Sequence, residues 1–237
     1  MAECEGLMNP PEASPRTIRS FVRRAGRVTP AQQRALELLW PRYGLESGTG
    51  VLDFPLIFGR AAPVVLEIGF GNGEQILARA IRAPDRNFLG IEVHEPGVGH
   101  LLLAAERANL SNLRIMRHDA VEVLNGQIPL ASLDEVQVLF PDPWPKKRHH
   151  KRRLIQPAFI ESIAQRLRPE GLLHLATDWE PYAQHMREVL AACRTFTDCT
   201  TDSLRTARVP ERDATRFERR GTRLGHRVQD LLYRRIP

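Results

Sequence analysis

The sequence predicts an α/β fold in which helices cover both faces of a doubly wound, mostly parallel sheet. Beyond Pro63, short apolar runs alternate with amphipathic stretches, which is the pattern of consecutive βα units. The chain has 237 residues, 42% of them hydrophobic and 26% charged, enough to bury one domain core. We therefore expect one domain over 61–237, preceded by a basic N-terminal arm over 16–60 and a disordered lead-in over 1–15.

The expected strands are the short apolar runs, which span 64–70, 88–93, 113–117, 135–140 and 172–177. Helical periodicity follows most of them, most clearly over 74–82, 97–108 and 157–167. A last apolar run, 228–236, is predicted to close the sheet at one edge.

Composition narrows the class of protein. A net charge of +6 favours a polyanionic partner, because each neutralised phosphate releases a condensed counterion; a solvated basic surface is the alternative. Cys4, Cys193 and Cys199 form no CxxC pair, which argues against a disulfide scaffold and a zinc site, and we expect no metal. No signal sequence precedes the chain's core and the longest apolar run, 101–105, is too short to span a bilayer, so we expect a cytoplasmic protein without membrane contact.

The N-terminal arm begins with five arginines between residues 16 and 27, interspersed with Ile18, Phe21 and Val22. Such a segment can lie along a phosphate backbone, with the apolar side chains as anchors. A solvated arm with no ligand is equally consistent with the pattern.

A glycine-rich loop ends the first strand and opens the first helix. Gly69, Gly71 and Gly73 alternate with other residues there, so the backbone can approach a nucleotide-like ligand without obstruction by Cβ atoms. The spacing is G-x-G-x-G, whereas nicotinamide-binding loops have G-x-G-x-x-G, and an acid, Glu67, precedes it. A carboxylate would repel a pyrophosphate but attract a sulfonium and an ammonium group, so the motif favours S-adenosylmethionine.

Two further acids follow the next strands. Glu92 is placed to accept the ribose hydroxyls of a nucleoside, and Asp119 is placed to meet the adenine edge. Either residue alone would be read as an exposed carboxylate at a strand end, but with Glu67 they mark three successive carboxyl ends of one sheet.

A proline-rich turn and a basic run follow the fourth strand. Three prolines in 141–145 restrict the backbone, so Asp142 is predicted to sit on a rigid loop above the cofactor. Six of the eight residues in 146–153 are Lys or Arg, a pattern of a solvated face or of a phosphate-binding track. Its position beside the methyl donor favours the track. Trp144 is expected to pack under its own turn, with stacking on an extruded base as the alternative.

Five motifs are distinctive when taken together: EIGFGNG, GIEVHEPGVG, FPDPWPKKRHHKRR, ATDWEPYA and TRFERRG. Through them, from about Arg19 to the C-terminus, the chain closely resembles the bacterial tRNA (guanine-N7)-methyltransferases. The resemblance implies a Rossmann-like class I methyltransferase fold, S-adenosylmethionine as cofactor, tRNA as partner with no obligate protein partner, and methylation of guanosine N7 at position 46 in the variable loop.

The resemblance also assigns residues. It implies that Glu67, Glu92, Asp119 and Asp142 line the cofactor pocket and that Asp142 is catalytic. The residues implied to contact the substrate are Lys146, Asp178, Thr215, Arg216, Phe217 and Glu218, and those implied to contact RNA are Arg148, His149, His150, Lys151, Arg152 and Arg153.

The chemistry implied needs no general base, because guanine N7 has a lone pair and no proton. We expect Asp142 to orient the base and stabilise the charge that arrives on it, and Asp178 or Glu218 to accept from guanine N1 and N2. The alternatives are purely structural roles, in which Asp178 caps the helix beginning near Glu180 and Glu218 pairs with an arginine. An RNA-binding protein without catalysis is the competing function, and a nicotinamide-dependent oxidoreductase is disfavoured by Glu67 and the glycine spacing.

Overall fold

The computed structural model describes residues 19–21, 26–200 and 227–237. Within them the strands are β1 (Gly44–Leu45), β2 (Val64–Ile68), β3 (Asn87–Ile91), β4 (Leu113–Met116), β5 (Leu133–Leu139), β6 (Leu167–Thr177), β7 (Phe196–Asp198) and β8 (Gln229–Arg235). The helices are α1 (Pro30–Leu38), α2 (Trp40–Tyr43), α3 (Phe54–Phe58), α4 (Glu74–Arg82), α5 (Glu95–Arg107), α6 (Ala120–Gly126), α7 (Pro157–Arg166) and α8 (Glu180–Ala192), with a 3-10 helix η1 (Lys147–Arg152).

The described strands form one eight-stranded sheet in the order β1-β4-β3-β2-β5-β6-β8-β7. Pairs from β1 to β6 are parallel, and β8 runs antiparallel to both β6 and β7. Chain order reverses at β2: β3 and β4 lie to one side of it, and β5 and β6 lie to the other. The predicted doubly wound, mostly parallel sheet is confirmed.

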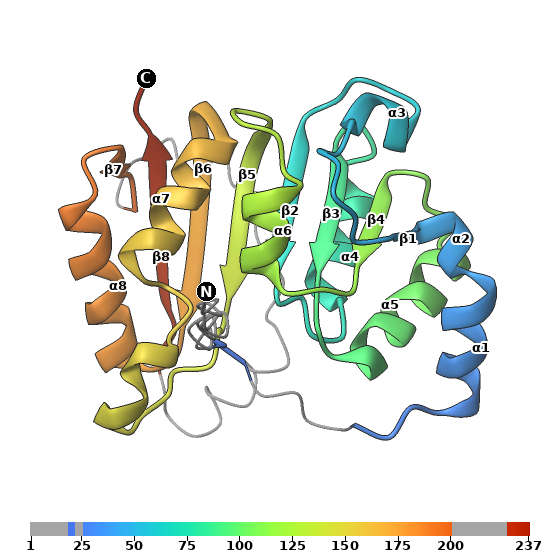
Figure 1. Ribbon diagram of the computed structural model, residues 1–237, viewed down its shortest axis with the longest axis horizontal. Helices are drawn as coiled ribbons and strands as arrows, with labels where there is room; N and C mark the ends of the chain where they lie inside the picture. The colour runs from blue at the N-terminus through green and yellow to red at the C-terminus, as the bar shows by residue number, and fades with distance from the viewer. Residues whose placement is uncertain (1–18, 22–25, 201–226) are drawn as a thin grey trace, which may run out of the picture.

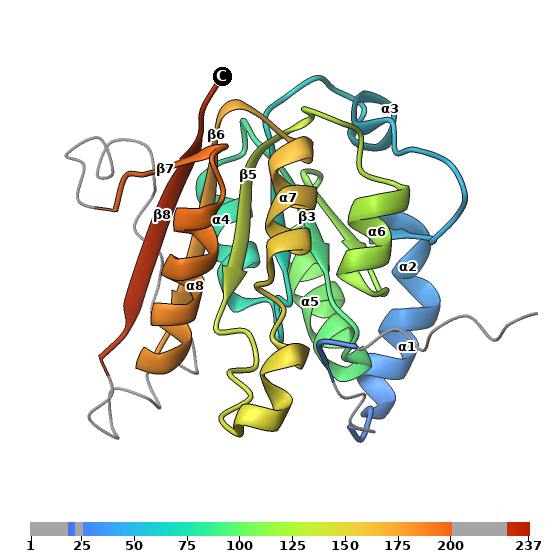
Figure 2. The same cartoon turned by 60° about the vertical axis from the view of Figure 1, so that its left-hand side comes forward.

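Helices cover both faces of the sheet (Figures 1 and 2). Residues alternate between the faces along each strand, and in β2 Val64, Leu66 and Ile68 pack into one core while Val65 packs into the other. The first core includes side chains of α3, α6, α7 and α8, and the second includes those of α1, α4 and α5. Continuous burial of β2 and β3 explains why these strands are mostly apolar on both faces, apart from Glu67 in β2 and Asn87 in β3.

The predicted strands and helices are found, with altered ends. β2 stops at Ile68 because Gly69 turns the backbone into the left-handed region, with φ of 72°. Helix α5 begins at Glu95 rather than residue 97, with Pro96 in its first turn, where a proline loses no hydrogen bond. β6 starts at Leu167, five residues before the predicted residue 172.

One prediction about the periphery is corrected. The run 228–236 contains β8, but β8 lies between β6 and β7, so β7 forms that edge of the sheet. The segment before residue 61 packs against the predicted domain. Helix α1 has a complete capping box between Thr29 and Gln32, and Gln32 Nε2 donates to Pro96 O of α5 at 3.0 Å. The predicted lead-in, 1–15, lies outside the described residues.

Candidate active site

The candidate site lies where the chain order of the sheet reverses. β2 and β5 are adjacent and parallel, with Ile68 opposite Val138, so the loops that follow them start side by side. In doubly wound sheets a crevice opens at this switch point, beyond the carboxyl ends of the strands. The glycine loop follows β2 and the turn carrying Asp142 follows β5, so the two predicted halves of the site lie at the same edge of the sheet.

The glycine loop fits the backbone of a nucleotide-binding turn. Gly69, Gly71 and Gly73 have φ of 72°, 58° and 78°, a region that side chains with a Cβ rarely adopt. A Cβ at Gly69 or Gly71 would meet no described atom within 4 Å, so the missing side chains leave room for a ligand. At Gly73 a Cβ would lie 2.7 Å from Leu101, so that glycine instead allows α5 to pack closely.

Glu67 lies beneath this loop with an unsatisfied oxygen. The side chain is 3% exposed, and its Oε2 has no hydrogen-bond partner among the described residues. Burial raises the pKa of Glu67 to about 8; Arg79 opposes the rise, and the carboxylates of Glu135 and Glu92 add to it. A buried acceptor without a partner beside an open glycine loop fits a ligand that brings cationic donors.

A buried ion pair supports the same face of the sheet. Arg79 of α4 donates from both terminal nitrogens to the two carboxylate oxygens of Glu135 in β5, at 2.9 and 2.8 Å. Burial alone would raise the pKa of Glu135, but Arg79 outweighs it and the pKa is lowered. Gln137 adds a third hydrogen bond to this carboxylate at 2.8 Å. Glu135 is therefore a fixed anion, and it contributes to keeping Glu67 protonated.

Glu92 binds the loops around it. Its Oε2 accepts from Gly71 N at 2.8 Å, and its Oε1 accepts from Val93 N at 2.6 Å and from His94 N at 2.9 Å. A carboxylate offers about four acceptor positions, so three are used here. Glu92 thus fixes the glycine loop to the end of β3, and one acceptor position of its carboxylate is not used by these three donors.

Asp119 is also hydrogen-bonded to the backbone that follows it. It is the N-cap of α6, and its Oδ1 accepts from Val121 N at 2.9 Å. The sequence placed it at the adenine edge; the structure places it at the carboxyl end of β4, on the same edge of the sheet as Glu67 and Glu92.

The turn after β5 is strained at both ends. Phe140 and Trp144 have φ of 52° and 45°, although neither is glycine. Such residues persist only where the surrounding structure enforces them, and they cluster at functional sites. Asp142 stands between them with its side chain exposed. Asp178 lies on the neighbouring connection, directly after β6, and Phe140 N donates to Ala176 O of β6 at 2.8 Å.

The helix-cap interpretation of Asp178 is not what the structure shows. The N-cap of α8 is Trp179, with no side-chain capping bond, and Trp179 N donates to Thr177 Oγ1 at 3.2 Å. Asp178 precedes the cap and is partly buried, at the same edge as Asp142.

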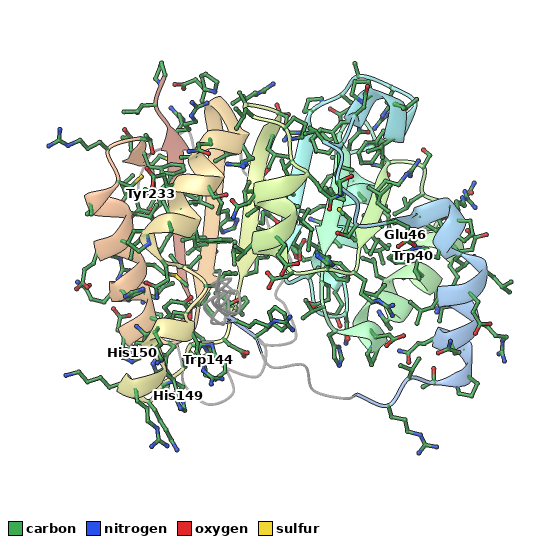
Figure 3. All side chains as sticks on the ribbon, in the orientation of Figure 1. Trp40, Glu46, Trp144, His149, His150 and Tyr233 are labelled. Carbon is green, nitrogen blue, oxygen red and sulfur yellow. The ribbon has the colours of Figure 1, made fainter. Side chains whose placement is uncertain are left out.

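Trp144 packs within its own segment. Its ring meets His149 edge-on at 5.8 Å, Arg152 lies over it at 5.1 Å, and its Nε1 donates to Ser20 O at 3.1 Å. Figure 3 shows Trp144, His149 and His150 gathered at the lower end of the molecule, beyond the carboxyl ends of the strands. The packed interpretation of Trp144 is therefore the one observed, and a residue of the N-terminal arm lies against this turn.

The basic run forms η1, and its members differ in exposure. Lys146, Lys147, Arg148 and Lys151 are exposed, and His149, His150 and Arg152 are partly exposed. Arg153, which the sequence grouped with the RNA-contacting residues, is only 3% exposed and so is not part of that surface. The other proposed substrate residues, Thr215, Arg216, Phe217 and Glu218, lie outside the described residues.

A separate cavity of about 270 Å³ lies beside the carboxyl ends of β1 and β4. Its polar side chains form hydrogen bonds or ion pairs with other side chains of the protein. Trp40 Nε1 donates to Glu46 (Figure 3), Arg117 pairs with Glu95, and His118 pairs with Glu122. It contains none of the predicted site residues; the lining is Leu36, Trp40, Leu45, Glu46, Ser47, Arg117 and His118. In the part of the chain that the structure describes, no cluster of three or more potential metal ligands is found, and no helix is both apolar and long enough to traverse a bilayer.

Sequence comparison assigns the chain to a family. Residues 61–231 match the model of a family described as putative methyltransferases. A relative from Halorhodospira halophila, named tRNA (guanine-N(7)-)-methyltransferase, is 54% identical over 226 residues, which cover 95% of this chain and 98% of the relative. Relatives with the same name from Nitrosococcus oceani and Alkalilimnicola ehrlichii are 53% and 56% identical, each over 93% of this chain and over 92% and 93% of their own lengths.

The chain belongs to the tRNA (guanine-N(7)-)-methyltransferase family. A solved structure supports the fold: the 16S rRNA methyltransferase KamB matches with a TM-score of 0.56 at 16% identity, over 83% of this chain and 99% of that one. Two features near this edge could not be found from the sequence. One is the buried Tyr182, and the other is the structural role of Arg153. Tyr182 stands in the ATDWEPYA motif, but nothing in the motif shows that its hydroxyl accepts from Ile155 N.

Proposed function

We propose that this protein transfers a methyl group from S-adenosylmethionine to N7 of a guanosine in tRNA, at position 46 in the variable loop. The main observation behind this proposal is that β2 and β5 are adjacent and parallel. The glycine loop, Glu67 and Asp142 therefore lie at one edge of the sheet, with η1 beside them. Family membership at 53–56% identity over nearly the whole chain supports tRNA as the substrate and the cytoplasm as the place of action.

The residues at hand suit the cofactor. S-adenosylmethionine supplies an electrophilic methyl group on a positively charged sulfur. Glu67 and Glu92 offer carboxylate oxygens under the loop, and Gly69 and Gly71 leave space above it. Asp119 stands at the next strand end, where the adenine of a nucleoside is expected.

The protein's contribution to the reaction is alignment and electrostatics. Guanine N7 attacks with its own lone pair, so no side chain has to remove a proton. Holding two reactants in line contributes about 7–11 kcal/mol to lowering a barrier. Asp142 is exposed on a rigid turn, where its carboxylate can hold the base and offset the positive charge that the base acquires. Asp178, on the neighbouring connection, is a further acceptor for the donors of the guanine edge.

The surface of η1 supplies phosphate contacts. Lys146, Lys147, Arg148 and Lys151 point their charge outward at the edge that carries Asp142. Such contacts fix the register of the RNA without reading its sequence. An RNA-binding protein without catalysis would need the same surface, but it would not need Glu67, the open glycine loop or the strained turn at Asp142.

The deciding experiment is methyl transfer to unmodified tRNA with labelled S-adenosylmethionine, followed by nuclease digestion and mass spectrometry of the fragments. We expect one 7-methylguanosine in the variable loop, and none when guanosine 46 is replaced by adenosine. Binding of tRNA without any transfer would favour the silent protein, and a methyl group on another nucleotide would refute the assigned position.

A further inference from the structure

Arg153 closes the basic run, yet it is folded into the protein. Its Nε donates to Pro143 O at 3.0 Å, and its terminal nitrogen lies 3.2 Å from His150 Nε2. Its backbone N donates to His150 O at 3.0 Å. Pro143 directly follows Asp142, so this guanidinium is hydrogen-bonded to the backbone of the residue next to the proposed catalytic one.

The guanidinium also lies on an aromatic ring from another element. Arg153 Cζ is 4.8 Å from the centre of the Tyr182 ring, in the first turn of α8. Tyr182 is fully buried, and its hydroxyl accepts from Ile155 N at 3.2 Å. Burial raises the pKa of Tyr182 to about 12, and the negative charge of Asp142 adds to the rise. One ring thus supports both Arg153 and the residue two positions later.

The turn needs such support. Phe140 and Trp144 hold left-handed backbone conformations on either side of Asp142, and such conformations relax when the surrounding structure stops enforcing them. A guanidinium is planar, so it can lie flat on a ring while Nε donates in its own plane; a lysine ammonium cannot do both. Since α8 follows Asp178, Arg153 also ties the Asp142 turn to the connection that carries Asp178.

We propose that Arg153 is a positioning residue, which holds the strained turn against α8 and so sets the place of Asp142 relative to Asp178. It acts on the rate of methyl transfer, not on the affinity for RNA phosphates. This inference rests on the proposed function, because it takes Asp142 as the residue that meets the base. It separates Arg153 from its neighbours Lys151 and Arg152, with which the sequence alone would group it.

The test is Arg153→Lys, which keeps the charge and most of the side chain's length. Its matched control is Arg166→Lys: Arg166 is also buried, and its Nε donates to a carbonyl, Leu124 O at 2.8 Å, but it lies at the end of α7 away from the site. The measurements are kcat and KM with tRNA, the salt dependence of tRNA binding, calorimetric affinity for S-adenosylhomocysteine, and Tm.

We expect Arg153→Lys to lower kcat by roughly 10- to 100-fold, since a displacement of about 1 Å can cost that much. The salt slope of tRNA binding and the affinity for S-adenosylhomocysteine should stay within about twofold of the original protein. Arg166→Lys should lower Tm and leave kcat unchanged. An unchanged kcat for folded Arg153→Lys, or a salt slope that falls as it does for a phosphate contact, would overturn the proposal.

Two further variants keep the outcome decisive. If Arg153→Lys does not fold, Arg153→Gln replaces it, because Gln leaves no buried charge, keeps a donor at the position of Nε and lacks the group that lies on the Tyr182 ring. In this variant kcat should still fall, by roughly threefold or more, with an unchanged salt slope, and an unchanged kcat rejects the inference. Asp142→Ala is measured in parallel. Full turnover by Asp142→Ala would refute the role assigned to Asp142, whereas loss of turnover there with normal kcat in Arg153→Lys refutes only the role of Arg153.

Discussion

Gly97 of α5 lies directly against the carbonyl oxygen of Gly71, so closely that a Cβ at Gly97 would stand 2.0 Å from that oxygen. The two glycines come from different motifs, EIGFGNG and GIEVHEPGVG. Glu92, in the second motif, accepts from Gly71 N at 2.8 Å. The second motif therefore contacts both the backbone nitrogen and the carbonyl oxygen of Gly71. The shape of the glycine loop depends on these two contacts.

Gly97→Ala should displace the glycine loop. The added methyl group cannot be accommodated beside a backbone oxygen, and overpacking of this kind costs about 1–3 kcal/mol. We expect a lower Tm and at least about tenfold weaker binding of S-adenosylmethionine, measured by calorimetry, because part of that cost falls on the cofactor loop. Gly126→Ala is the control: its Cβ would meet no described atom within 4 Å, so affinity and Tm should not fall.

Glu67 should make cofactor affinity depend on pH. Its pKa of about 8 means that the carboxyl is mostly protonated at neutral pH, whereas a cationic ligand favours the ionised form. Affinity for S-adenosylmethionine should therefore rise between about pH 6 and 8, by up to about tenfold per unit. Glu67→Gln should remove this dependence and weaken binding above pH 8, and any slope left in that variant belongs to the ligand's own amino group. Equal slopes in both proteins would contradict the assignment.

The same group predicts the sign of a stability change. Because the pKa of Glu67 is raised on folding, its favourable contribution is complete below the unfolded value of 4.5 and is lost as pH rises through about 8. Without ligand, Glu67→Gln should accordingly gain stability relative to the original protein as pH increases from about 5 to 8. Urea unfolding across this range measures the difference.

Arg79→Met should be strongly destabilising. Removing Arg79 leaves Glu135 charged and buried without its main partner, and breaking a buried pair costs about 3–5 kcal/mol. The matched control is Arg42→Met, because Arg42 pairs with Glu106 at 2.7 Å on the surface, where both side chains are over 40% exposed and such pairs contribute about 0–1 kcal/mol. Urea unfolding at neutral pH measures the loss of unfolding free energy in both variants. Similar losses would show that the buried pair contributes no more to stability than the surface pair.

Sequence reasoning predicted the parts of the fold whose causes are local. The buried parallel strands read as apolar runs, and the left-handed turn at Gly69, Gly71 and Gly73 requires glycine, so both could be located from residue types alone. Because the carboxyl ends of parallel strands share one edge, the sequence alone places Glu67 and Asp142 at the same edge of the sheet.

What was missed depends on contacts between distant segments. Nothing local marks Tyr43 as fully buried, or β1 as a partner of β4, so the contacts between the N-terminal region and the sheet could not be predicted. Likewise the apolar pattern of β8 gives its burial but not its neighbours. Arg153 shows the same limit at the site: the six Lys and Arg residues among the eight in 146–153 look alike in the sequence, and only the contacts with Pro143 and Tyr182 distinguish the last of them.

Asp142→Ala should abolish methyl transfer while tRNA affinity changes little. The carboxylate is exposed on the turn and not part of the basic surface, so its loss removes stabilisation of the charged base and not phosphate contacts. We expect kcat to fall by at least about 100-fold, as for other losses of one electrostatic group. Asp142→Asn, which keeps the shape, separates charge from fit. Full turnover by either variant would show that Asp142 is not the charge-stabilising residue.

Lys151→Ala combined with Arg152→Ala should weaken tRNA binding and flatten its salt dependence. Each lost phosphate contact reduces the slope of log affinity against log salt by roughly 0.7–0.9, so the pair should reduce it by about 1.5. Arg153 is left intact because it is bonded to Pro143, and kcat at saturating tRNA should therefore change little. Arg107→Ala is the control for net charge, since Arg107 is exposed in the last turn of α5, away from η1. If Arg107→Ala flattened the slope as much per residue, general attraction to the positive protein would account for binding, and η1 would not be the track that holds the RNA.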